Sequence, residues 1–182
     1  MDYNPIQTNT IPLSKKLINT FWISINKTIF RFTPKYFSIF RKYRVLLLKL
    51  FGAKIDWNVS INPTAIIEYP WNLSIKNKSS IGAKCWIYAL DYINIDEYSC
   101  IGDDVKLLTG SHDVDSYSFN LITKPINIGK GCWIATSATI LPGIHLGDYT
   151  VVAANSVVTK TTLEYDIVGG NPAIFLKKRK FR

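Results

Sequence analysis

The sequence has 182 residues, of which 47% are hydrophobic and 13% aromatic, so we expect one domain with a sizeable core and an appendage. No apolar run approaches the roughly 20 residues of a membrane-spanning helix, and the N-terminus lacks the order of a secretory signal. The net charge of +9 comes from the two terminal segments, since residues 55–175 hold seven basic and twelve acidic residues. This distribution disfavours a nucleic-acid-binding fold, which would carry its positive charge on the folded body.

The N-terminal region, residues 1–54, holds ten basic residues and one acid. After a loose arm, apolar residues recur at helical spacing over 13–32 and 36–50 and predict two amphipathic helices separated by a proline. Two interpretations of this basic pair stay open. The helices pack on the prism or on a neighbouring subunit as a cap, or residues 13–51 contact an anionic membrane surface. The corresponding locations are the cytoplasm, or the cytoplasm with peripheral contact at the inner face of the membrane.

From residue 55 onward an aliphatic residue recurs at every sixth position. Neither an α-helix nor a simple strand has this period, whereas a fixed six-residue repeat is typical of a parallel β-helix. Three hexads would form one coil of a triangular prism, with the aliphatic side chains inside. The repeated positions are Ile55, Ile61, Ile67, Leu73, Ile75, Ile81, Ile87, Ile93, Ile95, Ile101, Leu107, Ile128, Ile134, Ile140, Leu146, Val152 and Val158.

The repeat is interrupted once. Steps of two residues at Leu73–Ile75 and Ile93–Ile95 give coils of twenty residues, and the next such step is expected near residue 115 but occurs at Ile126–Ile128. The 13 extra residues lie within about 109–125. We therefore predict a β-helix over 55–168 with a loop let out at 109–125, where a regular solenoid often carries its function. Residues 169–182 are expected to form a basic tail.

Only two histidines are present. His112 lies at the root of the predicted loop, in Thr109-Gly110-Ser111-His112-Asp113, and is either a general base or a solvated loop residue. His145 occupies a hexad position beside an inward leucine and is expected at a prism corner. Catalytic zinc commonly has three protein ligands, so no metal is expected.

The cysteines, Cys85, Cys100 and Cys132, are odd in number and have no CxxC or histidine spacing. They lie at or beside the small-residue positions of the hexads. We expect buried free thiols in a reducing compartment. Glycine-rich phosphate-binding motifs are also absent from the sequence.

Several motifs together carry a resemblance to a known family. Residues 128–172 resemble the C-terminal half of the hexapeptide-repeat O-acetyltransferases, such as the galactoside, maltose and nodulation acetyltransferases, through Trp133, Pro142-Gly143, Val158-Thr159-Lys160 and Gly170-Asn171-Pro172-Ala173. More specifically, about residues 40–180 resemble the colanic acid O-acetyltransferase group. The motifs that carry this resemblance are Tyr69-Pro70-Trp71-Asn72-Leu73, Trp86-Ile87-Tyr88, Leu90-Asp91 and Thr109-Gly110-Ser111-His112-Asp113. The resemblance implies an all-β, left-handed parallel β-helix with an N-terminal helical appendage. It also implies acetyl-CoA as donor and a homotrimer with active sites between adjacent subunits.

The resemblance also assigns roles to individual residues. His112 matches the catalytic histidine, which would deprotonate a sugar hydroxyl during direct transfer. The acceptor-binding group would be Tyr88, Asp91, Ser111 and Asp113, although Asp91 is equally an ordinary corner residue. The acetyl-CoA-binding group would be Trp133 along the arm, small residues lining the pantetheine groove, and cationic or polar residues at the nucleotide end: Ala135, Thr136, Ala153, Ala154, Thr159, Lys160 and Lys177. Trp133 is alternatively an aromatic at the trimer seam, and Lys177 alternatively part of a solvated tail.

The sequence departs from the family pattern at three alanines. Glycine is frequent at the positions of Ala135 and Ala153, and asparagine is common at Ala89, which puts the identity of the acceptor in doubt. The expected function is acetyl-CoA-dependent O-acetylation of a sugar hydroxyl in bacterial surface polysaccharide biosynthesis. The alternatives are N-acetylation of an amino-sugar, or a non-catalytic hexapeptide scaffold that its basic ends tether to a partner or membrane.

Overall fold

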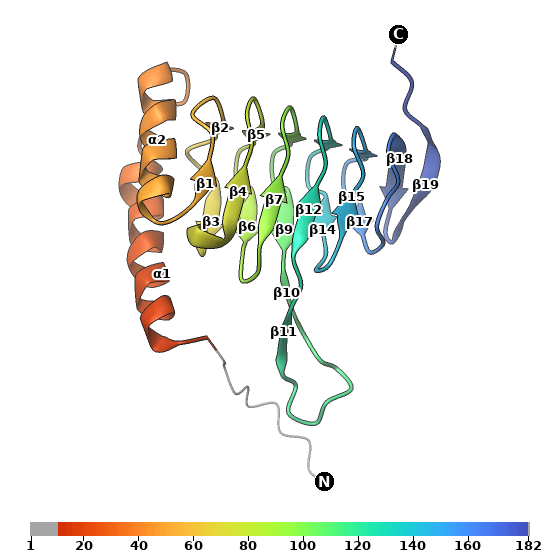
Figure 1. Cartoon of the computed structure of the whole chain (residues 1–182), viewed down its shortest axis with the longest axis horizontal. Coiled ribbons are helices and arrows are strands. Elements are labelled where there is room, and N and C mark those ends of the chain that lie inside the picture. Colours follow the sequence, from red (N-terminus) through yellow and green to blue (C-terminus); the bar gives the residue numbers. More distant parts are fainter. Residues whose placement is uncertain (1–10, 182) are drawn as a thin grey trace.

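A computed structural model describes residues 11–181 (Figure 1). A helical layer forms one end of the molecule, and a solenoid of stacked coils extends away from it. The layer contains α1 (Leu13–Ile25), which continues as a π-helical turn η1 (Asn26–Phe30), and α2 (Ser38–Leu50). The two predicted helices are therefore confirmed, with the first ending two residues earlier and the second beginning two residues later than expected.

The solenoid has three sheets, one on each side of a triangular prism, and their strands run parallel except for the last strand of the second sheet. The first sheet consists of β1 (Lys54–Ile55), β4 (Leu73–Ile75), β7 (Ile93–Ile95), β12 (Ile126–Ile128) and β15 (His145–Leu146). The second consists of β2 (Ser60–Ile61), β5 (Ser80–Ile81), β8 (Cys100–Ile101), β13 (Trp133–Ile134), β16 (Val151–Val152), β18 (Asp166–Gly170) and β19 (Ala173–Lys178). The third consists of β3 (Ile66–Glu68), β6 (Trp86–Tyr88), β9 (Lys106–Leu108), β14 (Thr139–Ile140) and β17 (Val157–Val158). A short 3₁₀ turn, η2 (Pro70–Asn72), joins β3 to β4.

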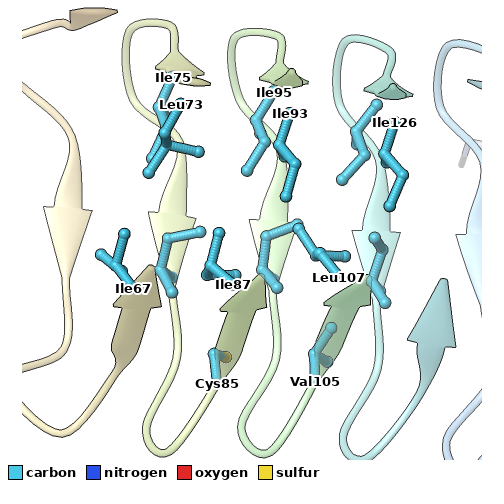
Figure 2. Close-up of a cluster of buried hydrophobic side chains, with 14 of the residues drawn as sticks. Ile67, Leu73, Ile75, Cys85, Ile87, Ile93, Ile95, Val105, Leu107 and Ile126 are labelled. Atoms are coloured by element: carbon cyan, nitrogen blue, oxygen red, sulfur yellow. The ribbon is translucent and has the colours of Figure 1, made fainter. Parts of the chain in front are cut away.

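The core is a stack of the predicted hexad aliphatics (Figure 2). Ile67, Ile87 and Leu107 are successive register partners in the third sheet, and all three are fully buried. The two-residue steps also have a structural meaning, because both aliphatics of a step point inward from one three-residue strand of the first sheet. The sequence pattern therefore predicted both the register and the width of the coils.

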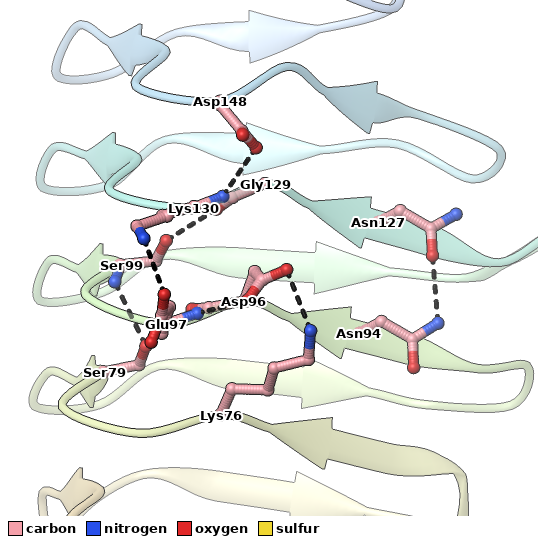
Figure 3. A network of polar contacts seen from close by, with 10 residues as sticks. All are labelled: Lys76, Ser79, Asn94, Asp96, Glu97, Ser99, Asn127, Gly129, Lys130 and Asp148. Carbon is pink, nitrogen blue, oxygen red and sulfur yellow. Dashed lines mark hydrogen bonds and ion pairs between the residues drawn. The ribbon is translucent and has the colours of Figure 1, made fainter.

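Side chains also connect successive coils at the corner between the first and second sheets (Figure 3). Lys76 pairs with Asp96 at 3.0 Å, and Lys130 pairs with Glu97 at 2.6 Å. On the outer face of the first sheet, the Asn94 amide donates to the Asn127 side-chain oxygen at 2.9 Å. Because the ion pairs are largely solvated, we assign most of the cohesion to the buried stack rather than to this corner.

The helical layer closes the open end of the first coil. Backbone groups that would face a preceding coil are bonded instead by helix side chains. The Trp22 indole donates to the Ile67 carbonyl at 2.6 Å, the Asn26 amide donates to the Ala65 carbonyl at 3.2 Å, and the Arg44 Nε donates to the Ile61 carbonyl at 2.8 Å. The interpretation that these helices pack on the prism as a cap is confirmed.

The opposite end differs from expectation. Residues 173–178 were expected to lie in a basic tail, but they form β19, which runs antiparallel to β18. The connection between the two strands contains a cis peptide bond before Pro172. The backbone pairing with β18 outweighs the low strand preference of the lysines in this segment.

Candidate functional site

The predicted inserted loop is a β-hairpin that leaves the prism between the third and first sheets (Figure 1). Its strands are β10 (Gly110–His112) and β11 (Leu121–Thr123), with His112 opposite Leu121. The root is closed where the Lys124 N–H donates to the Thr109 carbonyl at 2.9 Å. The hairpin holds Ser111 and His112 away from the apolar interior, at the edge of the solenoid.

His112 is half-buried and has a defined orientation. Its ring stacks on Phe119, with 4.5 Å between the ring centroids and 8° between the planes. Its Nδ1 lies 3.1 Å from the Phe119 carbonyl oxygen. A carbonyl can only accept, so Nδ1 carries the proton in this contact and the basic lone pair of the neutral ring is on Nε2.

The predicted acceptor-binding residues Tyr88 and Asp91 meet the hairpin at its root. The buried Thr109 hydroxyl donates to the Tyr88 carbonyl at 2.8 Å and accepts the Asp91 N–H at 3.0 Å. A side chain on Gly110 would approach within 3.1 Å of the Tyr88 ring. Burial, then the neighbouring Tyr69 and Glu68, raise the pKa of the Tyr88 hydroxyl, which stays protonated as a donor.

Ser111 and Asp113 lie on the hairpin itself. Ser111 is exposed, beside His112 on β10. Asp113 shapes the tip of the hairpin, because its carboxylate accepts the Asp115 N–H at 3.2 Å and its own N–H donates to the Asn120 carbonyl at 2.9 Å. The hairpin therefore brings both residues into the neighbourhood of His112.

The predicted pantetheine-groove residues lie elsewhere, on the second sheet and the corner that follows it. Trp133 projects from β13 and is 50% exposed. Ala135 and Ala153 stack in successive coils, with the Ala135 N–H donating to the Val152 carbonyl and the Ala153 N–H donating to the Val168 carbonyl, both at 2.9 Å. Because these N–H groups bond the next coil, the alanines offer a ligand close approach rather than hydrogen bonds. Thr136 and Ala154 are the exposed residues after them.

The predicted nucleotide-end residues lie on or beside the last strands of the solenoid, β17 and β19. Thr159 and Lys160 are exposed after β17, at the wall of a cavity of about 310 Å³. Lys177 is exposed on β19, opposite Ile167 of the second sheet. The same cavity is also lined by Ala173, Ile174 and Phe175 of β19, but Lys177 is not part of its lining.

His112 and Trp133 lie on different sides of the molecule. The hairpin leaves from the lower edge in Figure 1, whereas the second sheet, which carries Trp133, forms the upper side. Strand β13 continues β8 and β5 along that sheet, so no part of it reaches the hairpin edge. A single chain therefore presents two separate predicted half-sites, one around His112 and one around Trp133.

The cysteines differ partly from expectation. Burial raises the pKa of the Cys85 thiol to about 12 and that of Cys132 to about 11, so both stay protonated. Cys100, expected to be buried, is exposed, because it occupies the outward position of β8 beside the inward Ile101. Across residues 11–181, no three His, Cys, Asp or Glu side chains are arranged to hold a metal ion.

Comparison with known proteins establishes the family. Residues 125–160 match the family described as bacterial transferase hexapeptide (six repeats). The chain is 39% identical over 158 residues, 87% of its own length and 85% of the relative's, to the provisionally named colanic acid biosynthesis acetyltransferase WcaF of Escherichia coli K12. The chain therefore belongs to the hexapeptide-repeat acetyltransferases and is an acyltransferase of this family.

Solved structures agree with the fold. A hexapeptide-repeat acetyltransferase from Vibrio cholerae, crystallised with acetyl-coenzyme A, superposes with a TM-score of 0.81 at 24% identity, covering 95% of this chain and 93% of that one. A maltose O-acetyltransferase from Clostridium difficile 630 gives a TM-score of 0.81 at 22% identity, covering 93% and 90%. The predicted left-handed parallel β-helix class is confirmed.

Sequence reasoning missed the residues that orient the predicted site residues. Thr109 was visible only as part of a motif, and its buried hydroxyl was not anticipated. Phe119 lies seven residues from His112 in a segment with no periodic signal, and only the antiparallel pairing brings it beneath the imidazole. Such contacts depend on hairpin register, which no short-range pattern in this segment specifies.

Proposed function

We propose that the protein is an acetyl-CoA-dependent O-acetyltransferase that modifies a sugar hydroxyl in bacterial surface polysaccharide biosynthesis. The name of the Escherichia coli relative supports the polysaccharide assignment. The acetyl-coenzyme A complex of the Vibrio cholerae protein supports the donor, and the name of the maltose O-acetyltransferase supports a hydroxyl acceptor. Family membership alone leaves the acceptor open, so the assignment rests on chemistry at His112.

The observation that carries the proposal is the orientation of the His112 imidazole. With Nδ1–H donating to the Phe119 carbonyl, Nε2 is the atom that accepts a proton. In the reaction, Nε2 takes the proton of the sugar hydroxyl while the oxygen attacks the thioester carbonyl. The C–S bond then breaks, and the imidazolium returns the proton to the coenzyme A sulfur. Transfer is direct, without an acyl-enzyme.

The neighbouring residues have supporting roles in this proposal. Tyr88 and Asp91, joined to the hairpin through Thr109, orient the acceptor beside His112, together with Ser111 and Asp113. Trp133 packs along the pantetheine arm, and the small side chains at Ala135, Thr136, Ala153 and Ala154 permit close approach. Thr159, Lys160 and Lys177 meet the phosphates, which attract cations and hydroxyl donors.

The two half-sites require a second subunit. Because His112 and Trp133 lie on different sides of one chain, we propose a homotrimer in which His112 of one subunit faces the Trp133 sheet of the next. In a closed cyclic trimer, this heterologous contact occurs three times. Every His112 half-site is then paired with a Trp133 half-site of a neighbouring subunit. No metal takes part in the proposed reaction.

His112→Ala tests the proposed base. We expect kcat to fall by roughly 10²-fold or more, the size typical of a lost general base. Acceptor-dependent release of coenzyme A thiol, measured over matched hydroxy- and amino-sugars, gives both the rate and the acceptor class. His145→Ala is the matched control, because His145 is exposed on β15 and has no role in the proposal.

Three outcomes would contradict the proposal. Turnover unchanged in His112→Ala removes this histidine from the chemistry. Preferential acetylation of the amino-sugar replaces the hydroxyl acceptor by an amine. If wild-type protein neither turns over any acceptor nor binds acetyl-CoA in calorimetry, the scaffold alternative is favoured.

A further inference from the structure

The helices of the end layer have a second apolar face, which the prism does not cover. On α2, Val45 and Leu48 are buried against the first coil, whereas Ile39, Leu46 and Leu50 are exposed. Successive helix residues are rotated by about 100°. The three exposed side chains therefore share the side of α2 turned away from the prism, and Tyr43 lies in the same row.

The same arrangement continues on α1 and on the connecting segment. Leu13, Leu17 and Phe21 follow one another at a spacing of four residues and are all exposed. Between the helices, Phe32, Tyr36 and Phe37 are exposed by 81%, 89% and 63%. We call these exposed residues of both helices and their connection, together with Tyr43, the outer face. Its ten residues are Leu13, Leu17, Phe21, Phe32, Tyr36, Phe37, Ile39, Tyr43, Leu46 and Leu50.

The charge of this region has a single sign. Residues 11–55 contain no aspartate or glutamate. Lys27, Arg31, Lys35 and Lys42 are exposed on the same two helices and their connection. A partner of the outer face must therefore be anionic and must also accept aliphatic and aromatic side chains.

We propose that the outer face binds the surface of an anionic lipid bilayer. Aromatic and aliphatic side chains mixed with lysine and arginine are typical of helices that lie in the interface of a membrane. No helix among the described residues is long and apolar enough to cross a bilayer, so the contact is peripheral. The proposal goes beyond acetyl transfer and does not depend on it.

The position of the layer fits a planar partner. The layer forms one end of the molecule, and the solenoid with its hairpin extends to the other side of it (Figure 1). A bilayer can therefore meet both helices without colliding with the prism. The inner face stays packed on the first coil through Trp22, Asn26 and Arg44, so binding needs no unfolding of the cap.

Vesicle flotation of the full chain tests this proposal. The probes are vesicles of phosphatidylcholine alone and of phosphatidylcholine mixed with phosphatidylglycerol. We expect binding only to the mixed vesicles and a loss of binding as sodium chloride is raised. Leu46→Gln with Leu50→Gln should weaken binding by at least about tenfold, because both lose their insertion into the interface.

Charge variants separate the electrostatic part. Arg31→Gln with Lys35→Gln should weaken binding roughly thirty-fold, at about 1 kcal/mol for each cation near an anionic surface. Lys84→Gln with Lys180→Gln removes the same charge elsewhere and should leave binding within about threefold of wild type. Acetyl transfer to a soluble acceptor should be unchanged in the outer-face variants, which separates this proposal from the catalytic one.

Three results would overturn the proposal. Wild-type protein that fails to float with mixed vesicles excludes lipid as the occupant. Equal effects of the two charge pairs would mean non-specific attraction by net charge. Outer-face variants that change the oligomeric mass in solution while vesicle binding persists would assign the face to contact between copies of the chain.

Discussion

At the scale of single residues, Thr109 links the two parts of the proposed acceptor site. Its buried hydroxyl bonds the Tyr88 carbonyl and the Asp91 N–H, and its own carbonyl closes the hairpin that carries His112. Thr109 thus connects the proposed general base to the proposed acceptor-binding residues through its hydroxyl and its backbone carbonyl. In the proposed mechanism, Thr109 is therefore a positioning residue.

Thr109→Val tests this role, since valine has the same shape but no hydroxyl. We expect kcat to fall roughly tenfold, because the Asp91 loop and the hairpin root lose their shared bond, with KM for acetyl-CoA unchanged. Thr109→Ser keeps the hydroxyl and should restore most of the rate. A purely structural role would instead lower the thermal midpoint of both variants and change kcat in neither.

At the scale of elements, the hexad pattern predicted which residues point into the prism, because packing in the interior fixes their spacing. Residues such as Ile67, Ile87 and Leu107 must stack inside whatever surrounds them, so their period is visible in the sequence. The helical pair was predictable for the same reason, because its inner face obeys helical spacing. The outward residues were harder, as the exposed Cys100 shows, since the alternation of a two-residue strand is too short to recognise.

Two elements escaped prediction for a different reason. Strand β10 contains Gly110-Ser111-His112, residues with little strand preference, and forms only because β11 pairs with it. Strand β19 contains Lys177 and Lys178 and was expected as a tail, but the free edge of β18 holds it in the second sheet. Each of these strands forms by pairing with another strand, and its own residues do not predict that pairing. The location of the insertion was therefore predictable from the sequence, but its conformation was not.

Gly82→Ala tests how closely successive coils approach. A Cβ at this position would lie 2.6 Å from the Gly102 carbonyl carbon and 2.7 Å from the Asp103 nitrogen, both backbone atoms that cannot rotate away. We expect a loss of about 3 kcal/mol in the free energy of unfolding, measured by urea titration. Ala135→Gly, at the same corner further along, should cost only about 1 kcal/mol. Equal losses of unfolding free energy in Gly82→Ala and Ala135→Gly would mean that the coils can separate to admit a methyl group at Gly82.

At the scale of the whole molecule, the division of the site has a direct experimental consequence. The His112 hairpin and the Trp133 sheet lie on different sides of the prism, so each active site of the proposed trimer combines residues from two chains. Inactive subunits with lesions in different half-sites can then complement each other. A site contained in one chain cannot do so.

Mixed trimers of His112→Ala and Thr136→Trp subunits test this arrangement. Thr136 is exposed at the corner, so a tryptophan there fills the proposed pantetheine groove without entering the core. Each variant alone should be nearly inactive. Coexpressed in equal amounts, they should recover about a quarter of wild-type turnover, because half of the subunits keep the base and half of their neighbours keep the groove. No recovery in trimers shown to be mixed would place both half-sites within one chain.

The helical layer also governs whether the protein stays a discrete particle. Trp22, Asn26 and Arg44 bond carbonyls of the first coil that would otherwise be available to the last coil of another molecule. Repeat folds need such terminal caps because an uncovered edge recruits further chains. A chain shortened to begin after α2 would therefore tend to join end to end into filaments, and its failure to bind vesicles would not by itself demonstrate a lost membrane contact.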